Sequence, residues 1–344
     1  MARFPRQGAR VHAFSIGRQS STALGVCAEE IVSESQNASN LMEPRVTEAL
    51  AASSRRHKLD LKGAGRDHSM ADFATFVEER APGQLTALLR PVGADATARV
   101  VCVRHGMGHH NDGFETASFM NRDAELNRIG EAQATHAGEL LLAVGLLDAP
   151  EKTLVVISPM RRTLQTALLL LGADEWQCPT IVQPLAAETN VSSRFRAPGL
   201  IKHIVSAVQQ GDHGSTAAEL RQQFPAARHP QFDFSTVDRY CEQMGSRWAP
   251  GGAEEGKWWH HGHQGGIESR PEDAQARSAA LRTWLASEAA RRGASTVLLI
   301  SHGGMLKQTF ATDSFANSEF RCFDLLTSGE MRPCESVPHP LTSG

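Results

Sequence analysis

The sequence predicts an α/β fold built on a mostly parallel sheet, and two features of the chain lead to this prediction. From Thr97 onward, short apolar runs rich in β-branched residues alternate with segments whose apolar residues recur at helical spacing, which is typical of βαβ units. In addition, the strand-like runs lead into residues that carry chemistry. The run Val100–Val103, for example, leads directly into Arg104 and His105. Ligands of open parallel sheets bind where the strands end, so we expect the functional site at this edge.

Each predicted element has its own signal along the chain. The first strand, 99–103, is an apolar run that ends before Gly106, and a helix with one apolar face follows at about 128–144. After the second strand, Ser158 and Pro159 predict a helix N-cap followed by proline at the first helical position. Residues 189–266 are expected to be irregular. The other predicted strands are 154–157, 180–182 and 296–300, and the other predicted helices are 271–292 and a short one that begins near Met305.

The composition indicates a globular core with flanking segments. The chain has 344 residues, of which 41% are hydrophobic and 21% are charged, and its net charge is −3. This balance gives no sign of a nucleic-acid or membrane-surface partner. The apolar run Leu140–Leu147 is too short to cross a bilayer. We expect an extension with a linker, a helical lead-in, a globular domain with an inserted cap, and a tail, at 1–69, 70–96, 97–328 (cap 189–266) and 329–344.

The N-terminal segment and the cysteines bear on location in the cell. Residues 1–28 contain four arginines and no acidic residue. This bias is typical of organelle transit peptides, and a disordered extension without a targeting role explains it equally well. The six cysteines are scattered without a CxxC motif, which indicates a reducing compartment. We expect a cytoplasmic protein, or one that residues 1–28 direct to a chloroplast or mitochondrion.

The ends of the predicted strands bring a set of basic side chains and one acid to a single edge of the sheet. In chain order, the set is Arg104, His105, Arg162, Glu188 and His302. Guanidinium groups suit phosphate, and the N-terminus of the helix that carries Arg162 also favours an anion. Gly303 and Gly304 allow the backbone to approach a ligand closely. Together these residues predict a site for a phosphate dianion.

The reaction that fits this set is phosphoryl transfer through a histidine nucleophile. A neutral imidazole attacks phosphorus, and a carboxylic acid protonates the leaving alkoxide and then activates water. Glu188 must be protonated for the first of these roles, which predicts higher activity on the acidic side. No acidic cluster is present to hold magnesium, so we expect neither a metal nor another cofactor.

Several motifs carry a resemblance to a known family. Arg104–Gly106 is followed by Asn111, and the intervening letters form GMGHHN. The further motifs are D-x-x-L-N-x-x-G-x-x-Q, S-x-x-x-R-T-x-Q-T-A, S-H-G-G and N-S-E, at 123–133, 158–167, 301–304 and 317–319. In this order they resemble the histidine phosphatase superfamily, also called phosphoglycerate mutase-like, over about residues 98–325. The GMGHHN form is similar to its plant, algal and fungal branch.

The resemblance implies a three-layer α/β/α sandwich with a mostly parallel sheet and a cap. It implies that His105 is the phosphorylated nucleophile and that Arg104, Arg162 and His302 form the phosphate pocket. Asn111, with Gly106 and Gly303, would bind substrate or phosphate. Glu188 would be the proton donor, although it follows Leu185 at a spacing one residue longer than usual in the family. The implied partner is a small phosphorylated metabolite or a phosphopeptide, and the oligomeric state stays open.

Two other functions are kept as alternatives to a metal-independent phosphatase. The first is a mutase, against which the stretch AETNVSSRFRAPG counts because it lacks the Arg-Glu-Arg-Tyr-Gly of the family's mutases. The second is a non-catalytic phospholigand-binding or scaffold protein, against which the presence of all the pocket residues counts. His260, His261 and His263 have a spacing seen in metal sites, but their Gly-rich surroundings favour a loop with incidental histidines.

Overall fold

The computed structural model describes residues 44–52, 68–111, 122–172, 176–189, 214–248 and 271–334. The chain divides into two compact units, Met1–Glu43 and Pro44–Gly344, and every described residue belongs to the second. The predictions for residues 1–28 and for the histidines at 260–263 therefore lie outside the described residues.

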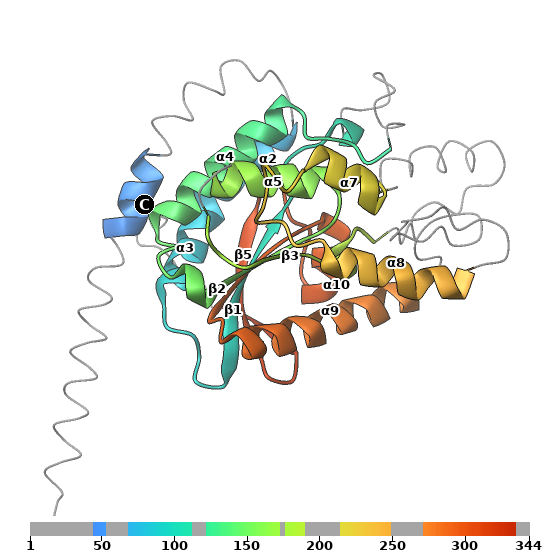
Figure 1. Ribbon diagram of the computed structural model, residues 1–344. Coiled ribbons are helices and arrows are strands. Elements are labelled where there is room, and N and C mark those ends of the chain that lie inside the picture. The colour runs from blue at the N-terminus through green and yellow to red at the C-terminus, as the bar shows by residue number, and fades with distance from the viewer. Residues whose placement is uncertain are drawn as a thin grey trace, which may run out of the picture. The chain divides into compact units, whose positions relative to one another are not determined.

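A mixed, mostly parallel sheet of six strands forms the centre of the described unit (Figure 1). The strands lie in the order β3-β2-β4-β1-β5-β6, in which β1 to β4 are parallel, β5 is antiparallel to β1, and β6 is antiparallel to β5. This arrangement confirms the predicted α/β class. The strand bounds are Ala96–Arg104 (β1), Thr153–Ile157 (β2), Thr180–Val182 (β3), Thr296–Ser301 (β4), Phe320–Leu326 (β5) and Met331–Pro333 (β6).

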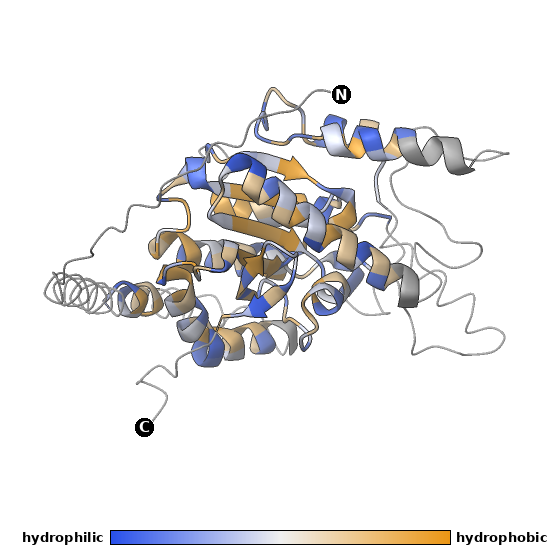
Figure 2. Ribbon diagram, turned by 90° about the horizontal axis from the view of Figure 1, so that it is seen from below, coloured by the Kyte–Doolittle hydropathy of each residue, from blue (hydrophilic) through white to orange (hydrophobic). Residues whose placement is uncertain are grey.

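Helices cover both faces of the sheet, as Figure 1 shows. One core cluster joins one face to α2 (His68–Thr75), the π-helical η1 (Phe76–Arg80), α3 (Ala81–Leu89), α4 (Arg128–Ala143) and α5 (Arg161–Leu171). The second cluster joins the other face to α9 (Pro271–Arg292) and α10 (Gly303–Phe310). The strands between these layers are strongly hydrophobic (Figure 2), so the α/β/α layering is present.

No helix in the described ranges is both long and apolar enough to pass through a bilayer.

Within the described residues 214–248, two helices stand where the sequence predicts irregular structure for 189–266. Helix α7 (Ala217–Gln223) begins with a capping box, in which Glu219 Oε2 accepts from the Thr216 N–H at 2.6 Å. Helix α8 (Ser235–Trp248) follows and packs near β3. The prediction was wrong here because α7 is only seven residues long and stands among glycine, proline and histidine residues.

The N-terminal lead-in is packed into the core. Pro82 lies in the first turn of α3, where proline is tolerated, and the lead-in is helical as predicted. Phe76 of η1 is fully buried and packs edge-on against Phe320, with ring centroids 4.9 Å apart. Residues 44–52 are also helical, and Val46 and Ala49 join the same cluster. Packing against the sheet thus begins within the stretch 1–69 that the sequence assigns to an extension.

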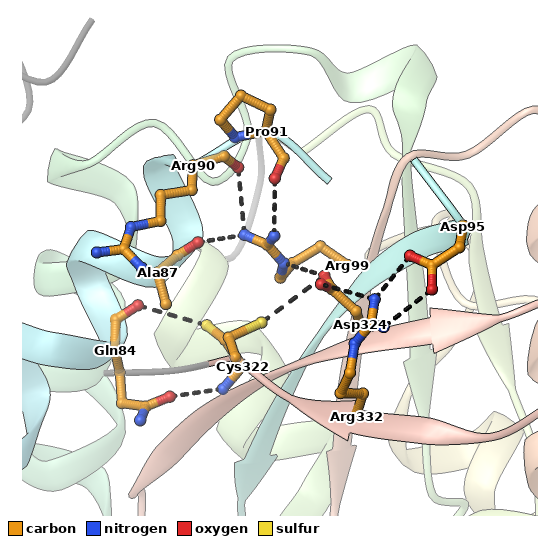
Figure 3. A network of polar contacts seen from close by, with 10 residues as sticks. Gln84, Ala87, Arg90, Pro91, Asp95, Arg99, Cys322, Asp324 and Arg332 are labelled. Carbon is orange, nitrogen blue, oxygen red and sulfur yellow. Dashed lines mark hydrogen bonds and ion pairs between the residues drawn. The ribbon is translucent and has the colours of Figure 1, made fainter. Parts of the chain in front are cut away.

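A network around Arg99 joins the end of the lead-in to the sheet (Figure 3). Arg99 in β1 donates from Nε to Asp324 Oδ1 at 2.9 Å and from its terminal nitrogens to the carbonyls of Ala87, Arg90 and Pro91. These carbonyls lie at or just after the C-terminal end of α3, where the last carbonyls of a helix lack the usual partner four residues on. The buried guanidinium therefore satisfies the helix end and holds it against β1 and β5.

Candidate active site

The register of the parallel strands aligns the predicted site residues. Val103, Ile300 and Ile157 are neighbours across β1, β4 and β2. The ladder continues by one residue, because the His105 N–H donates to Ser301 O and the Ser158 N–H donates to Ile300 O, each at 3.0 Å. The residues that follow these strands are consequently held at one level of the sheet edge.

The imidazole of His105 is buried and its two nitrogens have different surroundings. Nδ1 lies 2.6 Å from the carbonyl oxygen of Gly106, which can only accept, so Nδ1 carries the proton and donates. Nε2 then has a lone pair, which accepts from Nε–H of Arg162 at 3.3 Å. The local backbone therefore selects the tautomer that leaves Nε2 nucleophilic.

The charge state of His105 follows from the same surroundings. Burial lowers the pKa of His105 well below 6.5, and the positive charges of Arg162 and Arg104 lower it further. The pKa of His302 is lowered in the same sense, by burial first and then by Arg162. Both imidazoles are therefore neutral near pH 7.

Two buried polar atoms near His105 have no partner within the described residues. Arg104 donates from Nη1 to Phe315 O at 2.6 Å, but its buried Nε has no partner within the described residues. His302 contacts Ser158 Oγ at 2.8 Å through Nε2, and its buried Nδ1 is likewise unpaired among them. The rings of His302 and His105 are 5.0 Å apart. Buried polar atoms without partners are costly, and an anion held here would satisfy them.

His110 adds a third imidazole close to that of His105. Its ring centroid is 5.7 Å from that of His105, and its Nδ1 is another buried atom without a partner in the described part of the chain. Burial lowers the pKa of His110 well below 6.5, and Arg162 and Arg104 again contribute. The adjacent His109 is exposed.

The glycines predicted to approach a ligand also make room for protein groups. A Cβ atom on Gly106 would lie 2.3 Å from Gly130 O in α4, so the loop after β1 and this helix are in backbone contact. A Cβ atom on Gly303 would lie 3.1 Å from Arg104 Nε, and one on Gly304 would lie 2.6 Å from Glu188 Oε1. Gly303 and Gly304 therefore let the pocket arginine and the carboxylate pack against the start of α10.

Ser158 differs from its predicted role as a helix N-cap. Helix α5 begins three residues later, after Met160, and Ser158 Oγ contacts His302 instead. The Ser158 N–H extends the β2 ladder, and a residue before proline favours extended backbone, so the helix cannot begin here.

The N-terminus of α5 is also less open to an anion than the sequence suggests. Asp123 is fully buried, and its Oδ1 accepts from the Arg161 N–H at 2.9 Å. Its Oδ2 accepts from the Ser215 N–H at 2.8 Å. Burial raises the pKa of Asp123, and these hydrogen bonds act in the opposite direction. This carboxyl group ties Ser215 of the cap region to the helix that carries Arg162.

Glu188 lies beside the pocket on a segment that a distant arginine holds. Its Oε1 accepts from the N–H groups of Thr189 at 2.8 Å and Met305 at 3.0 Å. Arg277 of α9 donates to the carbonyls of Leu185, Ala187 and Glu188. The sequence does not indicate this role of Arg277, because nothing near it in the chain distinguishes it from any other helix arginine.

The loop 317–319 holds the main chain of Arg104 and His105 through hydrogen bonds. Asn317 Nδ2 donates to His105 O at 3.1 Å, and the Ser318 N–H is shared between Arg104 O and His105 O. The Arg104 N–H in turn donates to Glu319 O at 3.1 Å. These contacts give a structural reason for the N-S-E motif.

Asn111, by contrast, is exposed, and its Oδ1 accepts from the Gly108 N–H at 3.4 Å at the end of the short η2 helix (His109–Asn111). A contact of Asn111 with phosphate stays a prediction.

The fold and the pocket define a class of protein: an α/β domain whose sheet edge gathers two arginines and neutral histidines as in enzymes that act on phosphate esters. Residues 100–193 match the family model of the histidine phosphatase superfamily (branch 1). The resemblance found in the motifs is thus confirmed at the level of the superfamily, while the plant, algal and fungal branch stays a prediction.

Solved structures with similarity to the chain include both phosphatases and a mutase. A mycobacterial glucosyl-3-phosphoglycerate phosphatase has 20% identity and a TM-score of 0.36, covering 70% of this chain and 98% of its own. A phosphoserine phosphatase from Entamoeba histolytica has 15% identity and a TM-score of 0.34, covering 70% and 98%. A phosphoglycerate mutase from Bacillus anthracis has 19% identity and a TM-score of 0.38, covering 71% and 94%. No curated protein matches the chain.

Proposed function

We propose that this protein is a phosphatase that hydrolyses a phosphomonoester through a phosphohistidine intermediate on His105. The single observation that carries the proposal is the 2.6 Å contact between His105 Nδ1 and Gly106 O, which leaves the lone pair on Nε2. A neutral imidazole in this tautomer is a nucleophile without the help of a separate base.

In the first step, Nε2 of His105 forms a bond to phosphorus as the bond between phosphorus and the ester oxygen breaks. Glu188 gives its proton to the leaving alkoxide. The unpaired Nε of Arg104 and Nδ1 of His302, with the guanidinium of Arg162, suit the three phosphoryl oxygens that carry the charge. The product alcohol then departs.

In the second step, Glu188 takes a proton from water, and the water oxygen bonds to phosphorus as the N–P bond breaks. Orthophosphate leaves, and both His105 and Glu188 return to their starting states. The chemistry needs no cofactor, so we propose that the enzyme is independent of metals. We also propose that its substrate is a small phosphorylated metabolite or a phosphopeptide.

The test is turnover of phosphomonoesters by the native protein and by His105→Ala. We expect the native protein to release orthophosphate from at least one of a panel of sugar phosphates, phosphorylated acids and phosphopeptides. We expect His105→Ala to lose turnover while its melting temperature and circular dichroism stay those of a folded protein. Acid-labile phosphate should be trapped on His105 of the native protein. Retained turnover in the variant would reject covalent catalysis at this residue.

Most of the stretch AETNVSSRFRAPG, which bears on the choice between a hydrolase and a mutase, lies outside the described residues. Product analysis distinguishes the two activities directly. A hydrolase releases orthophosphate in proportion to the substrate consumed. A mutase converts one phosphoglycerate isomer to another, with little orthophosphate, after addition of a bisphosphoglycerate. A scaffold protein gives neither product and forms no phosphohistidine.

A further inference from the structure

The loop between α10 and β5 holds the pocket arginine, although it has no regular structure. Phe315 O accepts from Arg104 Nη1 at 2.6 Å, which fixes one end of the guanidinium and leaves Nε available. Residues 312–316 are neither helix nor strand. Their main-chain carbonyls therefore need partners other than those that secondary structure supplies.

Arg321, the second residue of β5, supplies these partners with one guanidinium group. Nη2 donates to Ser314 O at 2.8 Å, and Nη1 donates to Asp313 O at 3.3 Å. Nη1 also donates to Thr312 Oγ1 at 2.7 Å. The guanidinium carbon lies 4.1 Å from the centroid of the Phe315 ring, which is itself buried. Arg321 thus contacts four consecutive residues of the loop, and the last of them is the acceptor of Arg104.

Glu319 closes the loop onto the same guanidinium. Its Oε1 accepts from Arg321 Nε at 2.7 Å and pairs with Arg80 Nη1 at 2.8 Å, while its Oε2 accepts from the Ala316 N–H at 2.6 Å. The carboxylate is fully buried, so both ends of the loop 312–319 are tied to Arg321 in a place where hydrogen bonds are strong.

We propose that Arg321 is a positioning residue for the phosphate pocket, acting through the Phe315 carbonyl on the guanidinium of Arg104. This inference rests on the proposed function, because it assigns Arg104 to the phosphate. Arg321 itself has no role in the chemical step. Its function is to fix Phe315 O so that Arg104 Nη1 is held there and Nε faces the anion.

The contacts require arginine in particular. Four donations from a planar fork and stacking on the Phe315 ring cannot be reproduced by lysine, which has a compact ammonium group. Arg321→Lys therefore keeps the positive charge and removes the geometry. Arg99→Lys is the matched control, because Arg99 also binds one carboxylate and several carbonyls (Figure 3). Arg99 lies in β1, five residues before Arg104, and none of these contacts is made to the loop 312–319.

The experiment measures the dissociation constant of inorganic phosphate by calorimetry, and kcat and KM on p-nitrophenyl phosphate, for the native protein and both variants. We expect Arg321→Lys to weaken phosphate binding and lower kcat/KM by about 10-fold or more, the order of effect of a misplaced binding group. We expect Arg99→Lys to lower the melting temperature and leave both quantities within about twofold, as for an independent site. Equal effects of the two variants would overturn the proposal.

A second arm tests whether Arg321 acts through Arg104. In an Arg104→Lys background, Arg321→Lys should cause a further loss of no more than about twofold, because coupled residues are not additive. A full further loss would overturn the proposal. If Arg321→Lys does not fold, Thr312→Val removes one hydrogen bond of Arg321 and should give a smaller loss of phosphate affinity, whereas an unchanged affinity would overturn it. If the native protein binds phosphate without turnover, the proposed function is refuted, while the effect of Arg321→Lys on phosphate affinity still tests the positioning role.

Discussion

Replacing Gly106 with alanine tests how closely the pocket depends on backbone contact behind it. The new Cβ atom would lie 2.3 Å from Gly130 O, whereas real contacts of this kind stay above 3.0 Å, so the two segments must separate by about 0.7 Å. Gly106 O is the acceptor that fixes the His105 tautomer at 2.6 Å. A shift of this size at a nucleophile lowers kcat/KM by about 10²-fold, and the overpacking costs about 1–3 kcal/mol of stability.

The assay compares Gly106→Ala with Gly138→Ala on a generic phosphomonoester, with thermal unfolding of each protein measured in parallel. Gly138 lies on α4, the helix that carries Gly130, and a Cβ atom there would lie 2.2 Å from Leu170 O in α5. The two variants thus introduce the same kind of clash, but only one does so beside His105. We expect both to lose stability and only Gly106→Ala to lose catalytic efficiency.

Two results would refute this reasoning. Native-like turnover by Gly106→Ala would mean that the contact does not hold His105 in place. An equal loss of turnover in Gly138→Ala would mean that activity follows the general stability of the helix layer and not the local position of the nucleophile.

Four further predictions follow from the pocket. Glu188→Gln should slow turnover by about 10²-fold in single-turnover measurements, because it removes the proposed proton donor; a native rate would transfer that role to another acid. Since burial and two arginines lower the pKa of His105, its neutral form persists as the pH falls through 6.5, so the acid limb of the kcat/KM profile should lie well below 6.5 and not at the usual histidine value. His110→Ala should raise KM by about 10-fold, while the adjacent exposed His109→Ala should not, and identical values of KM would remove His110 from the pocket. Incubation with a chelator should leave turnover unchanged, and inhibition would indicate a metal that the proposal lacks.

The parts of the fold that were predicted correctly are those with a local signal. The run of β-branched residues in β1 predicts a strand, and the alternation of predicted strands with predicted helices indicates a parallel sheet. By contrast, β5 was not predicted, because Arg321 and Asp324 interrupt its apolar residues. Their charges are compatible with an interior strand because each has a partner: Arg321 pairs with the neighbouring Glu319, and Asp324 pairs with Arg99 from the distant strand β1.

The candidate site shows the same division. The residues directly after β1 and β4 were predicted because the end of a strand is visible in the sequence. Asp123, Arg277 and Arg321 were not assigned their contacts, since each binds main-chain groups that no short motif encodes. For Arg277 the separation along the chain reaches 92 residues. Only the three-dimensional register of the sheet brings such groups together.

The edge-on contact between Phe76 and Phe320 has a consequence for any proteolytic maturation of this protein. Phe320 directly follows Glu319, whose carbonyl receives the Arg104 N–H, and Arg80 reaches the same glutamate from the turn after Phe76. A protease that trimmed the N-terminus beyond Phe76 would therefore remove the contacts behind Glu319 and the Arg104 N–H, even though Phe76 lies 28 residues before Arg104, where the first recognisable motif begins. The smallest active fragment must begin upstream of that ring.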